Sequence, residues 1–346
     1  MIESILKRLR CPLGGELSLK IYKKNFNKTR NEFDIVDGLL TSKKNKSIYL
    51  IINCIPRMVD PILVDISALK FFLKKYKNKI QLEEKNRVSK FYNALYKKRK
   101  INKEFNLQWE IFGNEKKLYG MDKNDYKSWL FKEMPKKAFK DNFFRGKIIV
   151  EGGSGHGLFA EILSPLCKDY IGVDLNVNLS RLRDRKFNNV SFIQADLLKL
   201  PLVDNFSDFT FSHGVIHHTP KPKKAFSNLV KTLKKNGYFY LWVYPKEGFI
   251  FELLNKVLRF FTKRMNNRLL YHMTILFIPL LGIFKPYGGN RLTKNTFKEL
   301  RHTIYDWLSA KYQYHYSEKE MKDWFKEKKF KKIELTNQRT GVTAIK

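Results

Sequence analysis

A glycine-rich junction, Glu151-Gly152-Gly153-Ser154-Gly155-His156-Gly157, joins a short apolar run to a helical pattern and gives the strongest indication of the fold. The apolar run covers residues 147–151, and residues 158–166 have the spacing of an amphipathic helix. Glycine lets the backbone approach a bound ligand closely, as in loops that hold phosphate groups. The spacing is GxGxG, so the third glycine comes one residue earlier than in the dinucleotide-binding GxGxxG pattern.

Two acidic residues follow the next apolar runs, at the points where strands should end. Asp174 closes the run 169–174 and lies 21 residues after Gly153, while Asp196 closes the run 190–196. Parallel sheets bind ligands at the carboxyl ends of their strands, where a carboxylate can accept hydrogen bonds from ribose hydroxyls. Asp174 is therefore a candidate for binding a ribose, and Asp196 for accepting a hydrogen bond from an adenine amino group. Either acid taken alone is also typical of a helix cap or a surface turn.

Further strands and helices alternate after this region. Apolar runs over 208–212 and 238–244 predict two more strands, and between them a helix over 224–235 ends at the stop signal Asn236-Gly237. Continuous apolar strands that alternate with helices are typical of a parallel sheet covered on both faces. The sequence therefore predicts an α/β fold.

The C-terminus predicts one more helix and two closing strands. Ser317 and Glu320 have the spacing of a capping box, which starts a helix over 317–328. Short apolar runs over 333–335 and 341–345 then predict two strands at the end of the sheet.

At these residues the chain resembles the class I S-adenosylmethionine-dependent methyltransferases, in their small-molecule, methyltransferase-11-like branch. The acid before GxGxG, the acid after the second strand and Ala195-Asp196 after the third match the family pattern, and residues 212–220 resemble its fourth-strand motif. The resemblance runs from about residue 147 to residue 244 and resumes at the C-terminal helix and strands. It implies a Rossmann-like seven-stranded sheet with helices on both faces and an antiparallel last strand, and S-adenosyl-L-methionine as the cofactor.

The resemblance also implies which residues contact the cofactor. The glycine loop would support the methionine part, and Glu151 would take its ammonium group directly or through water. Asp174 would bind the ribose, and Asp196 would bind the adenine amino group with Leu197 against the ring. Gln108-Trp109 resembles a helix that closes over the cofactor in related enzymes. The expected cofactor-binding residues are Glu151, Gly153, Gly155, Gly157, Asp174, Asp196, Leu197, His213 and Trp109.

Methyl transfer is an in-line displacement at a sulfonium, so the protein must hold the methyl group and the acceptor atom close and aligned. A hydroxyl acceptor also needs a base, and histidine can hold a proton near neutral pH. His217 and His218, after the fourth predicted strand, and Tyr244, at the end of the fifth, are the candidate catalytic residues. The alternative is that the two histidines shape the pocket or cap a helix.

The first 60 residues predict a small β-rich segment that resembles a zinc ribbon preceding some of these enzymes. The resemblance rests on Arg10-Cys11-Pro12-Leu13-Gly14-Gly15, Asp37-Gly38-Leu39-Leu40 and Ile55-Pro56-Arg57, with a turn expected at Asp37-Gly38. Structural zinc needs four good ligands, which Cys11 and Cys54 alone do not supply. We therefore expect a degenerate segment over 1–60 that binds no metal and is kept for packing.

Three further regions follow from composition. Residues 61–145 are helical and basic and predict a connector or cap, and residues 146–346 form the expected methyltransferase domain. Its insert over about 246–291 is apolar and aromatic and predicts a helical lid over the acceptor. Within it, residues 269–284 form an uncharged run of 16 residues, short of the roughly 20 that a membrane-spanning helix needs. A buried helix pair is the expectation, and an interfacial membrane contact is the alternative.

The net charge of +35, from 68 Lys and Arg against 33 Asp and Glu, suggests a nucleic-acid partner at first sight. The surplus lies on the flanks, because residues 148–245 carry only +4. Lysine outnumbers arginine by 52 to 16, although arginine is the better fork for phosphates. The charge therefore favours a solvated surface, and a nucleic-acid partner is not favoured.

Together these patterns predict an S-adenosylmethionine-dependent methyltransferase that acts on a small-molecule, glycan or lipid-linked acceptor. The alternatives are an RNA methyltransferase that uses the basic flanks, or a cofactor-binding scaffold without catalysis. Three scattered cysteines and no apolar leader at the start of the chain predict a cytoplasmic protein. We expect no metal site and no transmembrane segment, and peripheral membrane contact stays open.

Overall fold

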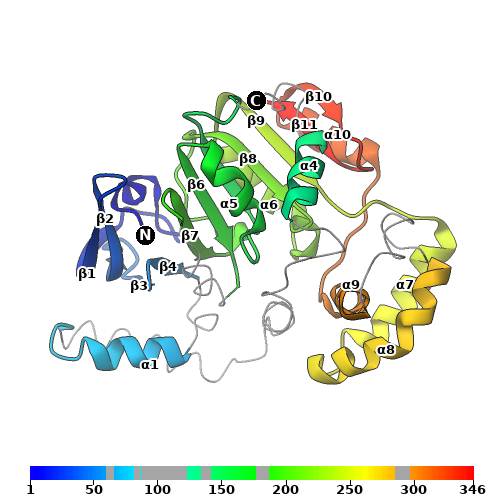
Figure 1. Ribbon diagram of the computed structural model, residues 1–346, viewed down its shortest axis with the longest axis horizontal. Coiled ribbons are helices and arrows are strands. Elements are labelled where there is room, and N and C mark those ends of the chain that lie inside the picture. Colours follow the sequence, from blue (N-terminus) through cyan, green and yellow to red (C-terminus); the bar gives the residue numbers. More distant parts are fainter. Residues whose placement is uncertain (60–65, 82–85, 87–122, 134–141, 177–186, 285–296) are drawn as a thin grey trace.

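The computed structural model describes residues 1–59, 66–81, 86, 123–133, 142–176, 187–284 and 297–346. Its described strands form one sheet of 11 strands (Figure 1). In spatial order they are β1 (Ser18–Asn27), β2 (Glu32–Thr41), β3 (Ile48–Ile52), β4 (Ile55–Met58), β7 (Val190–Ala195), β6 (Asp169–Asp174), β5 (Ile148–Gly152), β8 (Ser207–His213), β9 (Leu233–Trp242), β11 (Val342–Ile345) and β10 (Lys331–Leu335). The chain is α/β, as the sequence predicts.

The strands that follow residue 147 form the central and C-terminal part of this sheet. β7, β6, β5, β8 and β9 pair in parallel, and β11 lies antiparallel between β9 and β10. This part has the antiparallel closing strand that the resemblance implies. The sheet as a whole has 11 strands instead of the expected seven, because β1 to β4 extend it at the β7 edge.

The first four strands are an antiparallel meander whose last strand, β4, joins β7 in parallel. This join places Arg57 opposite Gln194 and Met58 opposite Ala195. An uncovered edge strand presents unpaired backbone groups that attract other chains. The N-terminal strands therefore cover one edge of the central sheet.

The turn expected at Asp37-Gly38 is wrong, because both residues lie inside β2. The buried Asp37 carboxylate accepts hydrogen bonds from Lys75 Nζ at 2.8 Å and Tyr76 Oη at 2.7 Å. These donors lie at the end of α1 (Ile66–Lys75), so the acid ties this helix to the strand. A Cβ on Gly38 would lie 2.7 Å from a carbonyl oxygen of β1, where the pairing of β1 with β2 is irregular. Glycine here marks a close approach of two strands.

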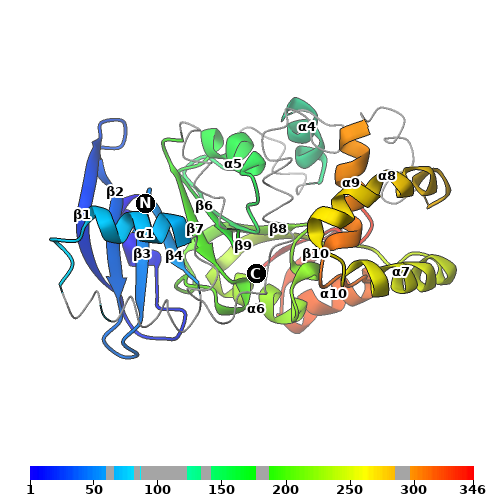
Figure 2. The same cartoon turned by 90° about the horizontal axis from the view of Figure 1, so that it is seen from below.

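Helices cover both faces of the central strands (Figure 2). One face carries α6 (Pro222–Thr232), α10 (Glu318–Glu327) and the 3-10 helix η1 (Glu3–Arg8). The other face carries α4 (Lys123–Glu133) and α5 (Leu158–Leu163). Each face has its own apolar cluster, and buried phenylalanines contribute to both.

Two helix ends show where local signals succeed and fail. The predicted helix over 224–235 ends earlier, because α6 stops at Thr232 and β9 begins at Leu233. Asn236 has a left-handed φ of 63°, and its N–H donates to the Lys346 carbonyl at 2.8 Å, so it lies within the strand. The capping box of α10 is confirmed, since Ser317 and Glu320 each accept a hydrogen bond from the other's N–H.

Three helices after β9 lie at the opposite end of the molecule from β1 (Figure 1). They are α7 (Phe249–Thr262), α8 (Asn267–Phe284) and α9 (Phe297–Ser309), and a separate apolar cluster joins them. The uncharged run of residues 269–284 lies within α8, which contains Pro279. No helix in the described part of the chain is long and apolar enough to cross a membrane.

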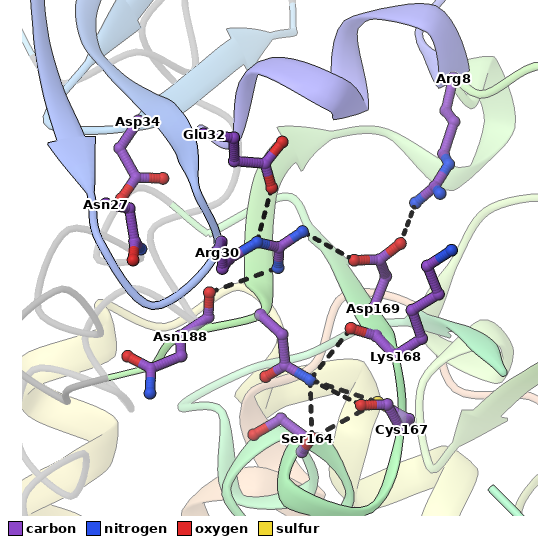
Figure 3. Close-up of polar contacts among 11 residues, drawn as sticks. Arg8, Asn27, Arg30, Glu32, Asp34, Ser164, Cys167, Lys168, Asp169 and Asn188 are labelled. Carbon is purple, nitrogen blue, oxygen red and sulfur yellow. Dashed lines mark hydrogen bonds and ion pairs between the residues drawn. The ribbon is translucent and has the colours of Figure 1, made fainter. Parts of the chain in front are cut away.

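Asp169, at the start of β6, fastens the N-terminal strands to the central sheet (Figure 3). It is 3% exposed, with Oδ2 at 2.9 Å from Nη1 of Arg8 and Oδ1 at 3.0 Å from Nη2 of Arg30. Arg30 also pairs with Glu32 at 2.6 Å and donates to the Asn188 carbonyl at 3.3 Å. One buried carboxylate thus binds two cations from η1 and from the β1–β2 turn.

We expect Asp169→Asn to lower the free energy of unfolding by about 3 kcal/mol, because it leaves two arginines without their buried partner. Asp204→Asn is the matched control: it removes the partner of Arg10 at 2.9 Å, where the side chains are 46% and 37% exposed. An exposed pair of this kind contributes about 1 kcal/mol or less. Urea denaturation measures both variants, and equal losses would contradict the role of Asp169.

Candidate functional site

The glycine loop connects β5 to α5 in a conformation that glycine favours. Gly153, Gly155 and Gly157 have φ values of 91°, 48° and 80°, in the left-handed region where a Cβ causes strain. The Gly153 N–H donates to the Val173 carbonyl at 2.7 Å, which holds the loop on β6. A Cβ on Gly153 would lie 2.3 Å from the side chain of Val215. The loop therefore packs directly against the segment that follows β8.

Asp174 lies at the carboxyl end of β6 and holds the same loop. Its Oδ2 accepts a hydrogen bond from the Gly155 N–H at 2.7 Å, and its Oδ1 accepts one from the Asn176 N–H at 2.7 Å. Burial raises the pKa of Asp174, and these backbone donors oppose the rise. Ser154 Oγ is buried in the loop and has no hydrogen-bond partner among the described residues. A buried hydroxyl of this kind fits a site that a polar ligand completes.

Glu151 lies in β5 just before the loop and is 2% exposed. Tyr170 Oη donates to its Oε2 at 2.5 Å. Burial raises the pKa of Glu151 to about 8, and the nearby charge of Asp174 adds to the rise. A cation beside this carboxyl would lower its pKa again, so the site favours a positively charged group. Sequence reasoning missed Tyr170, because it lies in an apolar run that carries no motif.

Asp196 follows β7 and begins the 3-10 helix η6 (Leu197–Lys199). Its Oδ1 accepts a hydrogen bond from the Leu198 N–H at 2.8 Å, so the acid acts as a helix cap. Leu197 is 6% exposed, and its carbonyl accepts a hydrogen bond from Asn228 Nδ2 at 2.9 Å. Asp196 therefore caps a helix, which is the alternative that its position in the sequence also allows. Its contact with adenine stays a prediction.

A buried chain of hydrogen bonds connects the N-terminal strands to the loop after β6. Arg57 Nη1, from β4, donates to Gln194 Oε1 at 3.1 Å. Gln194 Nε2 then donates to the Leu175 carbonyl at 3.2 Å, directly after Asp174. Both side chains are buried. The N-terminal strands therefore help to position Asp174, a candidate cofactor-binding acid. The sequence did not predict this contact between the two parts of the chain.

His213 ends β8 inside a group of aromatic rings. Its ring stacks on Trp242 with 4.6 Å between centroids, and Trp129 from α4 packs edge-on at 4.7 Å. His213 Nδ1 lies 3.0 Å from Tyr240 Oη. Burial lowers the pKa of His213 to about 3, so the imidazole is neutral at pH 7. These contacts suit a wall of the site better than a proton carrier.

The three candidate catalytic residues lie together. The His217 ring centroid is 4.1 Å from that of His218 and 3.9 Å from that of Tyr244. His218 Nδ1 lies 2.9 Å from the Tyr312 carbonyl oxygen, which only accepts, so Nδ1 carries the proton and Nε2 carries the lone pair. Tyr244 Oη donates to Asp306 Oδ2 at 3.1 Å.

The two histidines differ in access. His217 is fully buried, and neither ring nitrogen has a hydrogen-bond partner among the described residues. Burial holds the pKa of His217 well below its usual value. His218 is partly exposed, and burial also lowers its pKa while the charge of Asp306 opposes the change. Both imidazoles are neutral at pH 7, but only His218 has solvent access.

Two further predictions concern Trp109 and the N-terminal strands, which are not part of the site described above. Trp109 falls outside the described residues, so its cofactor contact stays a prediction. In the N-terminal strands, Cys11 Sγ lies 3.4 Å from Tyr49 Oη and accepts a hydrogen bond from Asn45 Nδ2 at 3.2 Å. Within the described ranges, no group of three or more His, Cys, Asp or Glu residues is placed to hold a metal ion.

Residues 150–241 match the family described as a methyltransferase domain. This segment contains the glycine loop, both acids at the strand ends and the histidine pair. This segment is therefore similar to a methyltransferase domain. The buried carboxyl of Glu151 and the hydroxyl of Ser154 fit a cofactor with a cationic and polar methionine part.

Two curated relatives match part of the chain. The malonyl-[acyl-carrier protein] O-methyltransferase of Marinomonas sp. (strain MWYL1) is 30% identical over 89 residues, which are 25% of this chain and 32% of that protein. The demethylmenaquinone methyltransferase of Renibacterium salmoninarum is 26% identical over 93 residues, or 27% and 39% of the two chains. This chain thus spans less than half the length of these curated relatives.

Solved structures are similar at low identity. A SAM-dependent methyltransferase from Aquifex aeolicus has a TM-score of 0.38 and 16% identity, and the match covers 65% of this chain and 98% of that one. The phosphoethanolamine N-methyltransferase 2 of Haemonchus contortus, in complex with S-adenosyl-L-methionine, has a TM-score of 0.41 and 16% identity, with 71% and 45% covered.

We expect Gly153→Ala to lower the free energy of unfolding by about 2–4 kcal/mol, because it adds a clash with Val215 to left-handed strain. Gly146→Ala is the control for strain alone, since Gly146 has a φ of 73° and open space at its Cβ. That variant should cost about 1–2 kcal/mol. Urea denaturation measures the difference. If both variants lose the same free energy, the packing of the loop on Val215 is not tight.

Proposed function

We propose that this protein transfers a methyl group from S-adenosylmethionine to a small-molecule, glycan or lipid-linked acceptor by in-line displacement. One observation carries the proposal: the Asp174 carboxylate holds the Gly155 N–H at 2.7 Å at the carboxyl edge of the sheet, inside the methyltransferase domain. Bound there, the cofactor supplies an electrophilic methyl on a sulfonium. The protein then has to align the acceptor and remove its proton.

The proposed cofactor contacts follow from the donors and acceptors at this edge. Glu151 faces the ammonium group, and its raised pKa falls as that cation arrives. Asp174 has two oxygens with more than one acceptor site each, so it can bind ribose hydroxyls while it keeps its backbone donors. Asp196 and Leu197 would bind the adenine. Gly153, Gly155 and Gly157 leave room for the methionine part, with His213 as a wall.

Among the three candidate catalytic residues, we propose that His218 takes the acceptor proton. Its Nδ1 donates to the Tyr312 carbonyl, which orients the ring and leaves the lone pair on Nε2. His217 is enclosed by His218 and Tyr244 and supports their positions. Tyr244 donates to Asp306 and forms part of the wall.

The acceptor class follows from the helices after β9. We propose that the insert over about 246–291 is a lid over the acceptor, because its described helices expose apolar side chains. This apolar surface suits an acceptor with an apolar or lipid-linked part. We further propose a division into 1–60, 61–145 and 146–346, with the degenerate zinc-ribbon-like segment positioning the cofactor site and the protein acting in the cytoplasm.

Saturating S-adenosylmethionine should raise the melting temperature, because a ligand at about 100 times its Kd adds about 2.7 kcal/mol to the native state. Asp174→Ala should abolish the shift, since it removes the ribose acceptor and the partner of the Gly155 N–H. Differential scanning fluorimetry measures both proteins. Asp204→Asn, which alters an exposed pair with Arg10 before the amino end of β8, should keep the full shift. No shift with the unaltered protein would refute the proposed function.

We expect His218→Gln to lower kcat about 100-fold or more with little change in KM, as expected for loss of a base. Lys319→Gln, at an exposed lysine of α10 outside the proposed lid, should keep full activity. Burial lowers the pKa of His218 below its usual value, so the base is neutral at pH 7 and the acid limb of kcat should lie below pH 6.5. The rates are measured as transfer of tritium from methyl-labelled S-adenosylmethionine to the acceptor that the wild type methylates fastest. An unchanged kcat would assign the proton to another group.

A further inference from the structure

Helix α7 presents a row of apolar side chains outward, while the polar residues Asn255, Arg259 and Thr262 are buried against the protein beside Phe251 and Leu258. The outward side chains that are more than half exposed, here called the outer face of α7, are Phe249, Ile250, Leu253, Val257, Phe260 and Phe261. At 3.6 residues per turn these six positions span about 120° of the helix circumference. Contiguous apolar patches on the surface of a protein mark interaction sites.

The polar side of α7 is buried because it completes the end of α9. Arg259 Nη1 donates to the Trp307 carbonyl at 2.6 Å, and its Nη2 donates to the Ala310 carbonyl. Thr262 Oγ1 donates to the Leu308 carbonyl at 3.1 Å. The last carbonyls of a helix have no partner inside the helix, so these donors fix the rotation of α7. The outer face is therefore held outward by specific hydrogen bonds.

The exposed charges on α7, on α8 and on the turn between them have one sign. Lys256, Lys263, Arg264 and Arg268 are exposed on α7, on α8 and on the turn between them. Glu252 is the sole acid of α7, and its Oε1 turns inward to His315 Nδ1 at 2.6 Å. The residues of α8 include no acid. Cations thus border the apolar face at its rim and at its C-terminal end.

One contact joins the cations directly to the apolar face. The Arg264 guanidinium carbon lies 3.9 Å from the centroid of the exposed Phe260 ring. Aromatic rings beside basic side chains suit a boundary where one side is apolar and the other carries anionic headgroups. An acidic partner is favoured over a second copy of this chain, because each copy carries a net charge of +35.

We propose that the outer face of α7 docks onto an anionic lipid bilayer, with the helix lying in the plane of the surface. The apolar side chains enter the headgroup boundary, and the bordering lysines and arginines bind lipid phosphates. α7 follows β9 within seven residues, at the carboxyl edge where the cofactor site lies, so docking brings the site to the membrane surface. This proposal goes beyond methyl transfer and does not depend on it.

The test is cosedimentation of the full chain with vesicles of phosphatidylcholine and phosphatidylglycerol, against pure phosphatidylcholine. The wild type should bind the anionic vesicles more strongly, and added salt should weaken this binding. The triple variant Leu253→Gln, Phe260→Gln and Phe261→Gln should lose binding by about tenfold or more, because three exposed apolar side chains no longer enter the lipid.

The matched control changes one leucine and two phenylalanines at the other end of the molecule. Leu13→Gln, Phe26→Gln and Phe71→Gln alter side chains that are 59%, 52% and 66% exposed, against 52%, 52% and 63% for Leu253, Phe260 and Phe261. The control should bind vesicles like the wild type. Thermal unfolding of both triple variants verifies that they fold.

Three outcomes would overturn the proposal. They are no binding of the wild type to anionic vesicles, equal binding by the α7 triple variant, and a wild-type dimer in light scattering that this variant dissociates. The last would assign the face to a second copy. The cofactor-induced rise in melting temperature is measured on the same proteins, so loss of docking with that rise retained separates this proposal from the proposed function.

Discussion

The hydrogen bond from the Gly155 N–H to the Asp174 carboxylate sets the geometry on which the candidate site depends. It joins the turn after β5 to the end of β6, so two segments 19 residues apart share one position at the sheet edge. Gly153 adds a second tie through Val173, and its missing Cβ admits Val215 from the segment after β8. Three strand ends thus meet because one carboxylate accepts a backbone donor and one glycine has no side chain.

The N-terminal segment contacts both ends of β6, the strand that carries Asp174. Arg8 and Arg30 bind Asp169 where β6 begins, while Arg57 reaches through Gln194 to the Leu175 carbonyl where β6 ends. The same strand is therefore held at both ends by cations from the first 60 residues. A buried carboxylate and a buried amide need such donors, because polar groups away from water are costly without partners. The segment has a positional role that packing alone does not describe.

Much of the central sheet could be predicted because its signals are local. The glycine loop, the acids at the ends of β6 and β7 and the capping box of Ser317 and Glu320 are each marked by residues that lie close together in the sequence. The four-strand extension could not be predicted, because Arg57 and Gln194 lie 137 residues apart and no local pattern marks their pairing. The prediction of a helix end at Asn236 was wrong for a related reason. A left-handed backbone conformation fits a helix end and a strand irregularity equally well.

The orientation of helix α7 is another feature that local sequence patterns do not predict. Periodicity in a sequence separates an apolar side from a polar side, and the usual inference buries the apolar one. Here Arg259 and Thr262 supply donors to carbonyls at the end of α9, and Phe251 stacks on Trp307. These contacts fix the rotation of α7 and leave most of its other leucine and phenylalanine side chains outward. The exposed apolar side chains of α7 can then contact the apolar region of a lipid bilayer. Since the surrounding side chains are cationic, the surface that best complements both properties is an anionic membrane.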